Sequence, residues 1–202
     1  MRRTSEEAVC ALIRDLCATR LPQKMGIPTD QIQVLSPTRK GAVGTVNLNR
    51  LLQAALNPQS PDKKERAYGD YQFREGDRVM QIRNNYEKDV FNGDIGRVIK
   101  IDGKNVTVAF PERPEGDYVT YAQGEVEELQ LAYAMSVHKS QGSEYPYVIL
   151  LMVQSHYIML QRNLLYTAVT RAKKCVTIVG NDTTFEQMIA NNSQLKRYSG
   201  LR

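Results

Sequence analysis

Two segments of this chain combine residue types that can hold a phosphate group. They are HKSQGSE at residues 138–144 and YTAVTRA at residues 166–172. Cations and hydroxyls fix phosphate oxygens without reading a base, and glycine permits close approach of the backbone. Arg171 ends an otherwise apolar stretch, where a charge is costly without a partner. We therefore expect Arg171 to meet an anion; the alternative is an ordinary helix-end cation, which the helix dipole favours.

A third segment, VLSPTRKG at residues 34–41, carries Arg39 directly after an apolar run. Open α/β sheets bind ligands beyond the ends of their strands, so Arg39 is a second candidate for contact with an anion. The alternative for Arg39 is a cation in a surface loop. Stretches 36–50 and 145–181 contain cations and no acid, whereas 111–128 is strongly acidic. Such segregation is expected of a surface that meets phosphate, although a solvated face gives the same pattern.

Several kinds of self-contained chemistry are missing from the sequence. There is no G-x-x-x-x-G-K-[ST] phosphate loop, and the nearest glycine-rich stretch, residues 41–45, lacks the lysine. No strand ends in paired acids that could hold magnesium. The 3 cysteines and 2 histidines are too few and too scattered for a zinc site or a disulfide framework. We expect no metal site in this chain and no cofactor bound stably by it alone.

Composition and the N-terminal residues suggest a compartment. The 202 residues are 42% hydrophobic and 24% charged with a net charge of +5, which is ordinary for a folded soluble protein. No apolar run is long enough to span a bilayer, and MRRTSEEAVC lacks the apolar core of a secretion signal. We therefore expect a cytoplasmic protein without a membrane partner.

The elements that must position these residues follow from hydrophobic periodicity. The first part predicts an amphipathic helix from Thr4 to about Arg20, a strand at 32–35, a helix at 45–56 and a linker at 57–72. Short alternating runs then predict five strands of a small barrel, at 77–82, 95–101, 105–110, 118–122 and 126–129.

The pattern returns to α/β after the barrel. It predicts strands at 132–137, 147–153 and 176–179, a helix with Leu160, Leu164, Leu165 and Ala168 on one face, and a last helix capped by Thr183. We divide the chain into a first α/β part with its linker at 1–72, the barrel at 73–130 and the remaining α/β part at 131–202.

Taken in order, segments 34–41, 135–145 and 163–172 resemble motifs IV, V and VI of superfamily 1 helicases. Segments 76–86 and 91–96 resemble the SH3-like insertion of the RecD-like branch, the family of the exodeoxyribonuclease V alpha chain. The resemblance covers about residues 30 to 182. It implies an α/β fold: a RecA-like parallel sheet with helices on both faces, interrupted by a small SH3-like β-barrel.

The resemblance also implies roles for residues of the three segments. Arg171 and Arg39 would reach the γ-phosphate of ATP as catalytic arginines, and Gly142 and Glu144 would lie on the nucleotide side, although an acid at a helix N-terminus is the alternative for Glu144. In the same motif V segment, His138, Lys139 and Ser140 would face DNA; a structural role is the alternative for His138. ATP and Mg²⁺ would be bound by the full-length protein.

The barrel carries a further candidate DNA contact. Asparagine side chains can donate to phosphates, and an exposed tyrosine can stack on a base. The candidates are Arg83, Asn84, Asn85 and Tyr86. The alternative is a structural turn with Tyr86 packed on the barrel.

Together these expectations describe the C-terminal motor half of an ATP-dependent DNA helicase. The resemblance implies 5′-to-3′ movement, a role in DNA repair or recombination, single-stranded DNA as partner, and a first RecA-like domain in the missing N-terminal part. Other subunits of a helicase–nuclease complex are a further implied partner. One rival is a stand-alone, non-enzymatic single-stranded nucleic-acid-binding module; another is a helicase of the phage or conjugative-transfer type.

Overall fold

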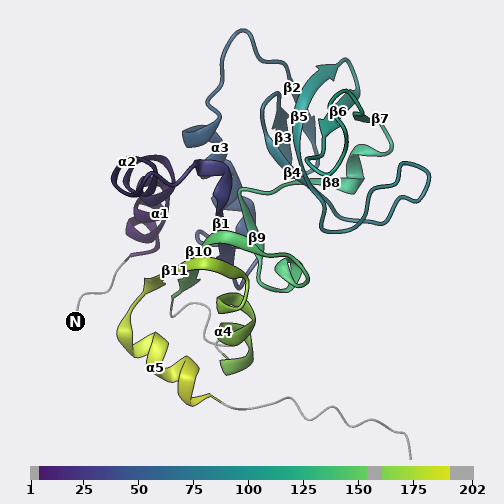
Figure 1. The fold of residues 1–202 in the computed structure, drawn as a ribbon. Coiled ribbons are helices and arrows are strands. Elements are labelled where there is room, and N and C mark those ends of the chain that lie inside the picture. The colour runs from purple at the N-terminus through teal and green to yellow at the C-terminus, as the bar shows by residue number, and fades with distance from the viewer. Residues whose placement is uncertain (1–4, 154–160, 192–202) are drawn as a thin grey trace, which may run out of the picture.

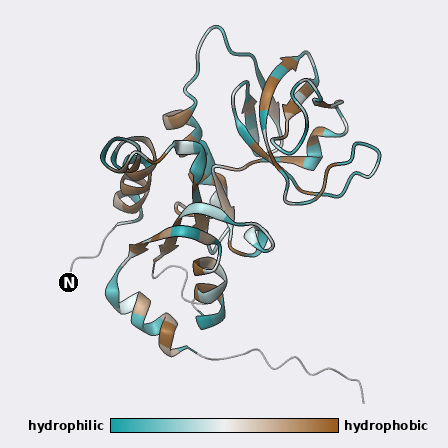
Figure 2. Cartoon of the chain, viewed as in Figure 1, coloured by the Kyte–Doolittle hydropathy of each residue, from teal (hydrophilic) through white to brown (hydrophobic). Residues whose placement is uncertain are grey.

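A computed structural model describes residues 5–153 and 161–191 of the chain. It contains a parallel sheet covered by helices and a separate antiparallel domain beside it (Figure 1). Figure 2 shows hydrophobic residues gathered in the strands at the centre of the molecule, where the two parts of the sequence that flank the barrel come together.

The parallel sheet has four strands in the order β11-β10-β1-β9. Their bounds are Ile32–Ser36 for β1, Ala134–Ser136 for β9, Tyr145–Met152 for β10 and Ala172–Gly180 for β11. All three pairings are parallel, and Val34 lies opposite both Ala134 and Ile149. This confirms the predicted RecA-like sheet. The predicted burial of the last strand was wrong: β11 is an edge strand with one described neighbour, and in it only Val179 is buried.

Helices cover both faces of this sheet, as predicted. The bounds are Glu6–Asp15 for α1, Leu21–Met25 for α2, Thr45–Leu56 for α3, Arg162–Val169 for α4 and Asp182–Ala190 for α5. In Figure 1, α1 and α3 lie on one side of the sheet and α4 and α5 on the other. A π-helical stretch, Leu16–Arg20, joins α1 to α2, so the first helical segment extends past the predicted end to Gly26 in a left-handed conformation.

Side chains cap the first turns of α1 and α5. The cap of α1 is Ser5, whose hydroxyl accepts from the amide of Ala8; Thr4 lies outside the described residues, as does Leu160. The cap of α5 is Asn181 rather than Thr183, and its side chain accepts from the amide of Thr184 at 2.7 Å. Asparagine is among the strongest helix caps, which explains the shift.

The predicted linker at 57–72 was wrong in its second half. Residues Glu65–Tyr68 (β2) and Tyr71–Arg74 (β3) form an antiparallel hairpin. Its turn is Gly69-Asp70, with Gly69 at φ 55°, which is the conformation that tight hairpins need. Charged and aromatic residues follow one another without a regular period in these short strands, so no hydrophobic pattern marks them, although Phe73 and Arg74 are buried.

The inserted domain is a five-stranded antiparallel sheet in the order β7-β6-β5-β4-β8. The strands are Arg78–Gln81 (β4), Ile95–Asp102 (β5), Asn105–Ala109 (β6), Val119–Tyr121 (β7) and Leu129–Leu131 (β8). Residues Val126–Glu128 form a 3-10 turn instead of the start of the last predicted strand. Gly96 has no room for a side chain, since a Cβ there would lie 2.5 Å from Val108.

One buried carboxylate joins the two parts. Asp77 is 0% exposed and accepts four hydrogen bonds: from Gln53 at 2.6 Å, Asn57 at 2.7 Å, the Arg74 amide at 2.7 Å and the Tyr133 hydroxyl at 2.9 Å. Burial raises the pKa of Asp77, and these hydrogen bonds oppose the shift. Because the donors come from α3 and its C-cap, from the end of β3 and from the segment between β8 and β9, this network fixes the barrel on the parallel sheet.

Within the described residues, no helix has the length and apolar character needed to cross a membrane.

Candidate functional site

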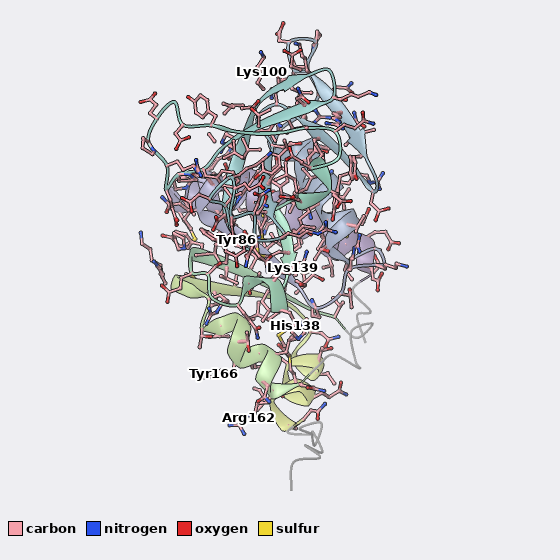
Figure 3. All side chains as sticks on the ribbon, turned by 90° about the vertical axis from the view of Figure 1, so that its right-hand side faces the viewer. Tyr86, Lys100, His138, Lys139, Arg162 and Tyr166 are labelled. Carbon is pink, nitrogen blue, oxygen red and sulfur yellow. The ribbon has the colours of Figure 1, made fainter. Side chains whose placement is uncertain are left out.

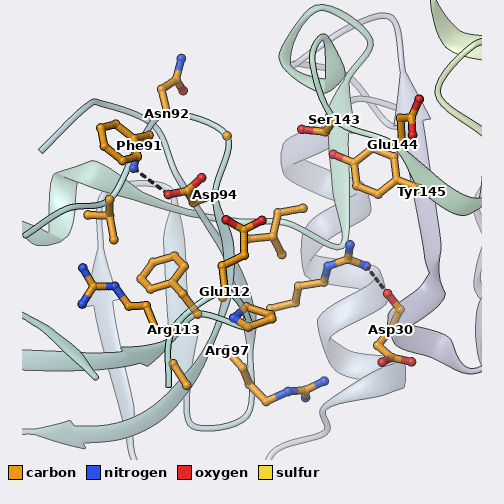
Figure 4. Close-up of a pocket in the computed structure, with 18 of the residues that line it drawn as sticks. Asp30, Phe91, Asn92, Asp94, Arg97, Glu112, Arg113, Ser143, Glu144 and Tyr145 are labelled. Carbon is orange, nitrogen blue, oxygen red and sulfur yellow. Dashed lines mark hydrogen bonds between the residues drawn. The ribbon is translucent and has the colours of Figure 1, made fainter. Parts of the chain in front are cut away.

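A cleft of about 1350 Å³ lies between the barrel and the amino-terminal edge of the parallel sheet. The sheet side contributes Asp30, residues 141–146, Arg171 and Lys173. The barrel contributes Arg78, residues 89–97, Ile99, and residues 109–118 apart from Gly116. Figure 4 shows Ser143, Glu144 and Tyr145 on one side of the cleft and Phe91, Asp94 and Arg113 on the other. The predicted nucleotide-side residues of motifs V and VI therefore line one space.

Arg171 is held by oxygen atoms that carry no formal charge. Its Nε donates to the carbonyl of Thr167 at 3.2 Å, its Nη1 to the carbonyl of Ser143 at 3.1 Å, and its Nη2 to the Thr170 hydroxyl at 3.3 Å. Among the described residues it forms no ion pair with a carboxylate. The guanidinium is thus fixed in direction while its charge is left for an anion.

Gly142 and Glu144 accompany Arg171 in the cleft. Gly142 has a φ of 87°, and a Cβ there would meet nothing within 4 Å, so the need for glycine is conformational. Glu144 forms an exposed ion pair with Lys173 at 3.3 Å. Exposed pairs are weak, so the Glu144 carboxylate can exchange this partner for a hydroxyl donor.

Arg39 lies at the opposite edge of the sheet. It follows the carboxyl end of β1, whereas Arg171 immediately precedes the amino end of β11, and these strands run parallel. Arg39 is exposed and pairs with Asp70 at 3.1 Å. The structure therefore does not bring the two predicted catalytic arginines together in one site.

His138 and Lys139 lie at the surface, in a 3-10 turn that follows β9. The Nζ of Lys139 donates to Gln130 of β8 at 2.6 Å, which links this turn to the barrel. Ser140 differs from the prediction: it is buried, and its hydroxyl donates to the carbonyl of Val137 at 2.7 Å. Its side chain closes the turn and is not presented to a ligand. Figure 3 shows Tyr86, Lys139 and His138 along the same side of the molecule.

Of the four barrel residues predicted to contact DNA, three are bonded within the barrel and one, Tyr86, has an exposed ring. Asn84 accepts from the amide of Asn92 at 2.9 Å, and Asn85 accepts from the amide of Lys88 at 3.1 Å and donates to Glu128, so both stabilise the loop. Arg83 pairs with Glu127 at 2.5 Å.

Tyr86, by contrast, is 78% exposed instead of packed on the barrel. Its ring makes a T-shaped contact with Phe91, which is itself 41% exposed, at a centroid distance of 6.0 Å, and its hydroxyl accepts from Asn84 at 3.5 Å. Sequence reasoning did not single out Phe91 as a site residue. The residue types around Phe91 gave no signal for this role, because it depends on the exposure of the ring in the folded chain.

Two family models match the chain. The ATP-dependent RecD-like DNA helicase SH3 domain matches residues 48–110, and the UvrD-like helicase C-terminal domain matches residues 131–179. Among curated proteins, the ATP-dependent RecD2 DNA helicase of Deinococcus radiodurans is 37% identical over 165 residues, covering 82% of this chain and 22% of the relative. The RecD subunit of the RecBCD enzyme of Mycolicibacterium smegmatis is 33% identical, covering 86% and 29%.

The chain therefore spans about a quarter of the length of these relatives. Among solved structures, a chain from a structure of DNA unwinding at forked double-stranded DNA by two coordinating Pif1 helicases aligns with a TM-score of 0.56 at 18% identity, covering 87% of this chain and 44% of that chain. The Bacteroides Pif1 helicase with ADP-AlF3 and single-stranded DNA aligns with a TM-score of 0.55 at 20% identity, covering 89% and 47%. These structural likenesses support the fold.

Proposed function

We propose that this chain, which is the C-terminal region of a RecD-like superfamily 1 helicase, forms half of an ATP-dependent motor that moves on single-stranded DNA in DNA repair or recombination. The observation that carries this proposal is the guanidinium of Arg171, fixed by carbonyl groups beside Gly142 and Glu144 in one cleft. A cation held in this way can stabilise charge on a transferring phosphoryl group.

ATP and Mg²⁺ would be shared with a first RecA-like domain elsewhere in the protein. That domain would supply the phosphate loop and the magnesium ligands, neither of which this sequence contains. Arg171 would contact the γ-phosphate held by that domain, Glu144 would accept from a ribose hydroxyl, and Gly142 would let the backbone approach. The isolated chain would therefore be inactive as an ATPase.

The DNA side would be formed by exposed groups on the turn after β9 and on the barrel. His138 and Lys139 would hold phosphates, and Tyr86 would stack on a base, with Arg83 nearby. The exposure of Tyr86 and its edge contact with Phe91 support this role over a structural one. A stand-alone DNA-binding module would use the same surface but would have no need for the fixed, unneutralised charge of Arg171.

Strand separation by the full-length protein tests the proposal. Two duplexes are compared, one with a 5′ single-stranded tail and one with a 3′ tail, with and without ATP and Mg²⁺. We expect unwinding of the 5′-tailed duplex only, and only with ATP, in line with the 5′-to-3′ polarity proposed for this chain. No unwinding of either substrate would contradict a helicase, whereas unwinding from the 3′ tail would contradict the polarity alone.

Replacing Tyr86 with alanine is expected to weaken binding of single-stranded DNA to this chain about tenfold, because stacking on an aromatic ring is worth roughly 1–3 kcal/mol per base. Tyr86→Phe keeps the ring and should bind like the parent chain. Fluorescence anisotropy with a labelled oligonucleotide measures both. Tyr118→Ala is the matched control, since Tyr118 is another exposed tyrosine, 46% accessible, in the acidic stretch of the barrel. Equal losses in Tyr86→Ala and Tyr118→Ala would argue against stacking at Tyr86.

A further inference from the structure

The carboxyl edge of the parallel sheet brings two cations together from segments far apart in the sequence. Strands β1 and β9 are neighbours in register, with Ser36 opposite Ser136. Arg39 and Lys139 each follow these serines by three residues. Adjacent strands lie about 4.8 Å apart, so the two chains leave the sheet side by side at this edge.

The electrostatics agree with this placement. The pKa of Lys139 is lowered, first by partial burial and then by the positive charge of Arg39. Lys40 and His138, the neighbours of these cations in the chain, are also exposed. A cluster of exposed cations of this kind raises the local concentration of anions such as phosphate groups.

Asp70 occupies part of this surface in the free protein. It belongs to the turn between β2 and β3, and its carboxylate pairs with Arg39 at 3.1 Å, with side chains 62% and 66% exposed. Exposed pairs of this kind are weak. A phosphate oxygen can therefore replace the Asp70 carboxylate on the Arg39 guanidinium.

We propose that Arg39 binds a backbone phosphate of single-stranded DNA together with Lys139, and that Asp70 competes with the DNA for Arg39. This inference rests on the proposed function, because it names the ligand of the surface assigned there to DNA. The ligand expected for Arg39 thereby changes from the nucleotide to the DNA. The guanidinium lies at the sheet edge opposite Arg171 and outside the cleft that Arg171 lines. The affinity for DNA at this edge therefore depends on the competition between the Asp70 carboxylate and a DNA phosphate for the Arg39 guanidinium.

The test measures binding of a labelled oligothymidylate of about 12 nucleotides to this chain across a salt series. Arg39→Ala should weaken binding roughly tenfold and reduce the slope of log affinity against log salt by about 0.7, the loss of one phosphate contact on a single strand. Asp70→Asn should strengthen binding about two- to threefold, and this gain should vanish when Arg39→Ala is present.

Arg20 and Asp15 provide the matched control, because they form an exposed ion pair of the same chemistry on the first helical segment. Arg20→Ala and Asp15→Asn should leave affinity and slope unchanged. The inference is overturned if Arg39→Ala behaves like Arg20→Ala, or if the gain of Asp70→Asn persists in the Arg39→Ala chain. If the parent chain fails to bind the oligonucleotide, the proposed DNA-binding function is wrong. If the parent chain binds and Arg39→Ala has no effect, only the role of Arg39 is wrong.

Discussion

Replacement of Arg171 with lysine is expected to lower ATP turnover by the full-length protein about a thousandfold. An arginine that stabilises charge on the transferring phosphoryl group is worth roughly 10³ to 10⁵ in kcat. Lysine keeps the charge but cannot reproduce the planar fork that now meets the carbonyls of Thr167 and Ser143. Steady-state ATP hydrolysis measured with saturating single-stranded DNA gives the effect. Affinity for the DNA should be unchanged, since Arg171 and the turn of His138 lie at opposite edges of the sheet.

Lys173→Ala is the control for this substitution. Lys173 lines the same cleft as a cation, but it is exposed and already paired with Glu144. We expect turnover within a few fold of the parent protein. Near-normal turnover by Arg171→Lys, or an equal loss in Lys173→Ala, would show that general positive charge in the cleft, and not the fixed guanidinium, supports hydrolysis.

The second large effect is expected at Asp77. Asp77→Asn keeps the shape of the side chain but replaces one carboxylate oxygen with an amide NH₂ group. Each oxygen of Asp77 accepts two hydrogen bonds, so the NH₂ group would face two donors. The side chains cannot simply flip to compensate, because Gln53 also donates to the Gln72 carbonyl and Asn57 also donates to the Glu75 carbonyl. Leaving buried donors unpaired costs about 1–3 kcal/mol each. We therefore expect the free energy of unfolding to fall by about 3 kcal/mol in urea titrations.

Asp102→Asn is the matched substitution at the surface. Asp102 pairs with Lys100, and both side chains are at least 60% exposed, so its replacement should change stability by less than about 0.5 kcal/mol. A similarly small effect of Asp77→Asn would contradict the view that this carboxylate fixes the barrel on the parallel-sheet domain.

Much of the fold could be predicted because its elements have strong periodic patterns. The buried runs at β1 and β10, the helix at 45–56 and the alternating strands at 95–101 and 105–110 all appear where they were expected. The hairpin of β2 and β3 was missed because its strands have only four residues each and mix charged with aromatic side chains, which gives no clear period. The network of Asp77 was hidden for another reason: its partners are scattered from residue 53 to residue 133.

The candidate site was predictable by segment but not in its geometry. The two motif strings contain the residues that line the cleft and the surface turn, yet nothing in their letters shows that Ser140 is turned inward. That Arg39 lies beside Lys139 depends on the register of β1 with β9, which only the folded sheet defines. Phe91 was overlooked because its exposure, not its type, makes it a candidate partner of Tyr86.

Binding of single-stranded DNA by this chain across a salt series, with ATP hydrolysis measured in parallel, tests the central claim most directly. A motor half with an intact DNA surface predicts binding whose log affinity falls with log salt at a slope near −2, as expected for about three phosphate contacts. It also predicts no ATP turnover. Robust ATP hydrolysis by the purified chain alone would contradict the account, because a complete phosphate site would then have to exist within it.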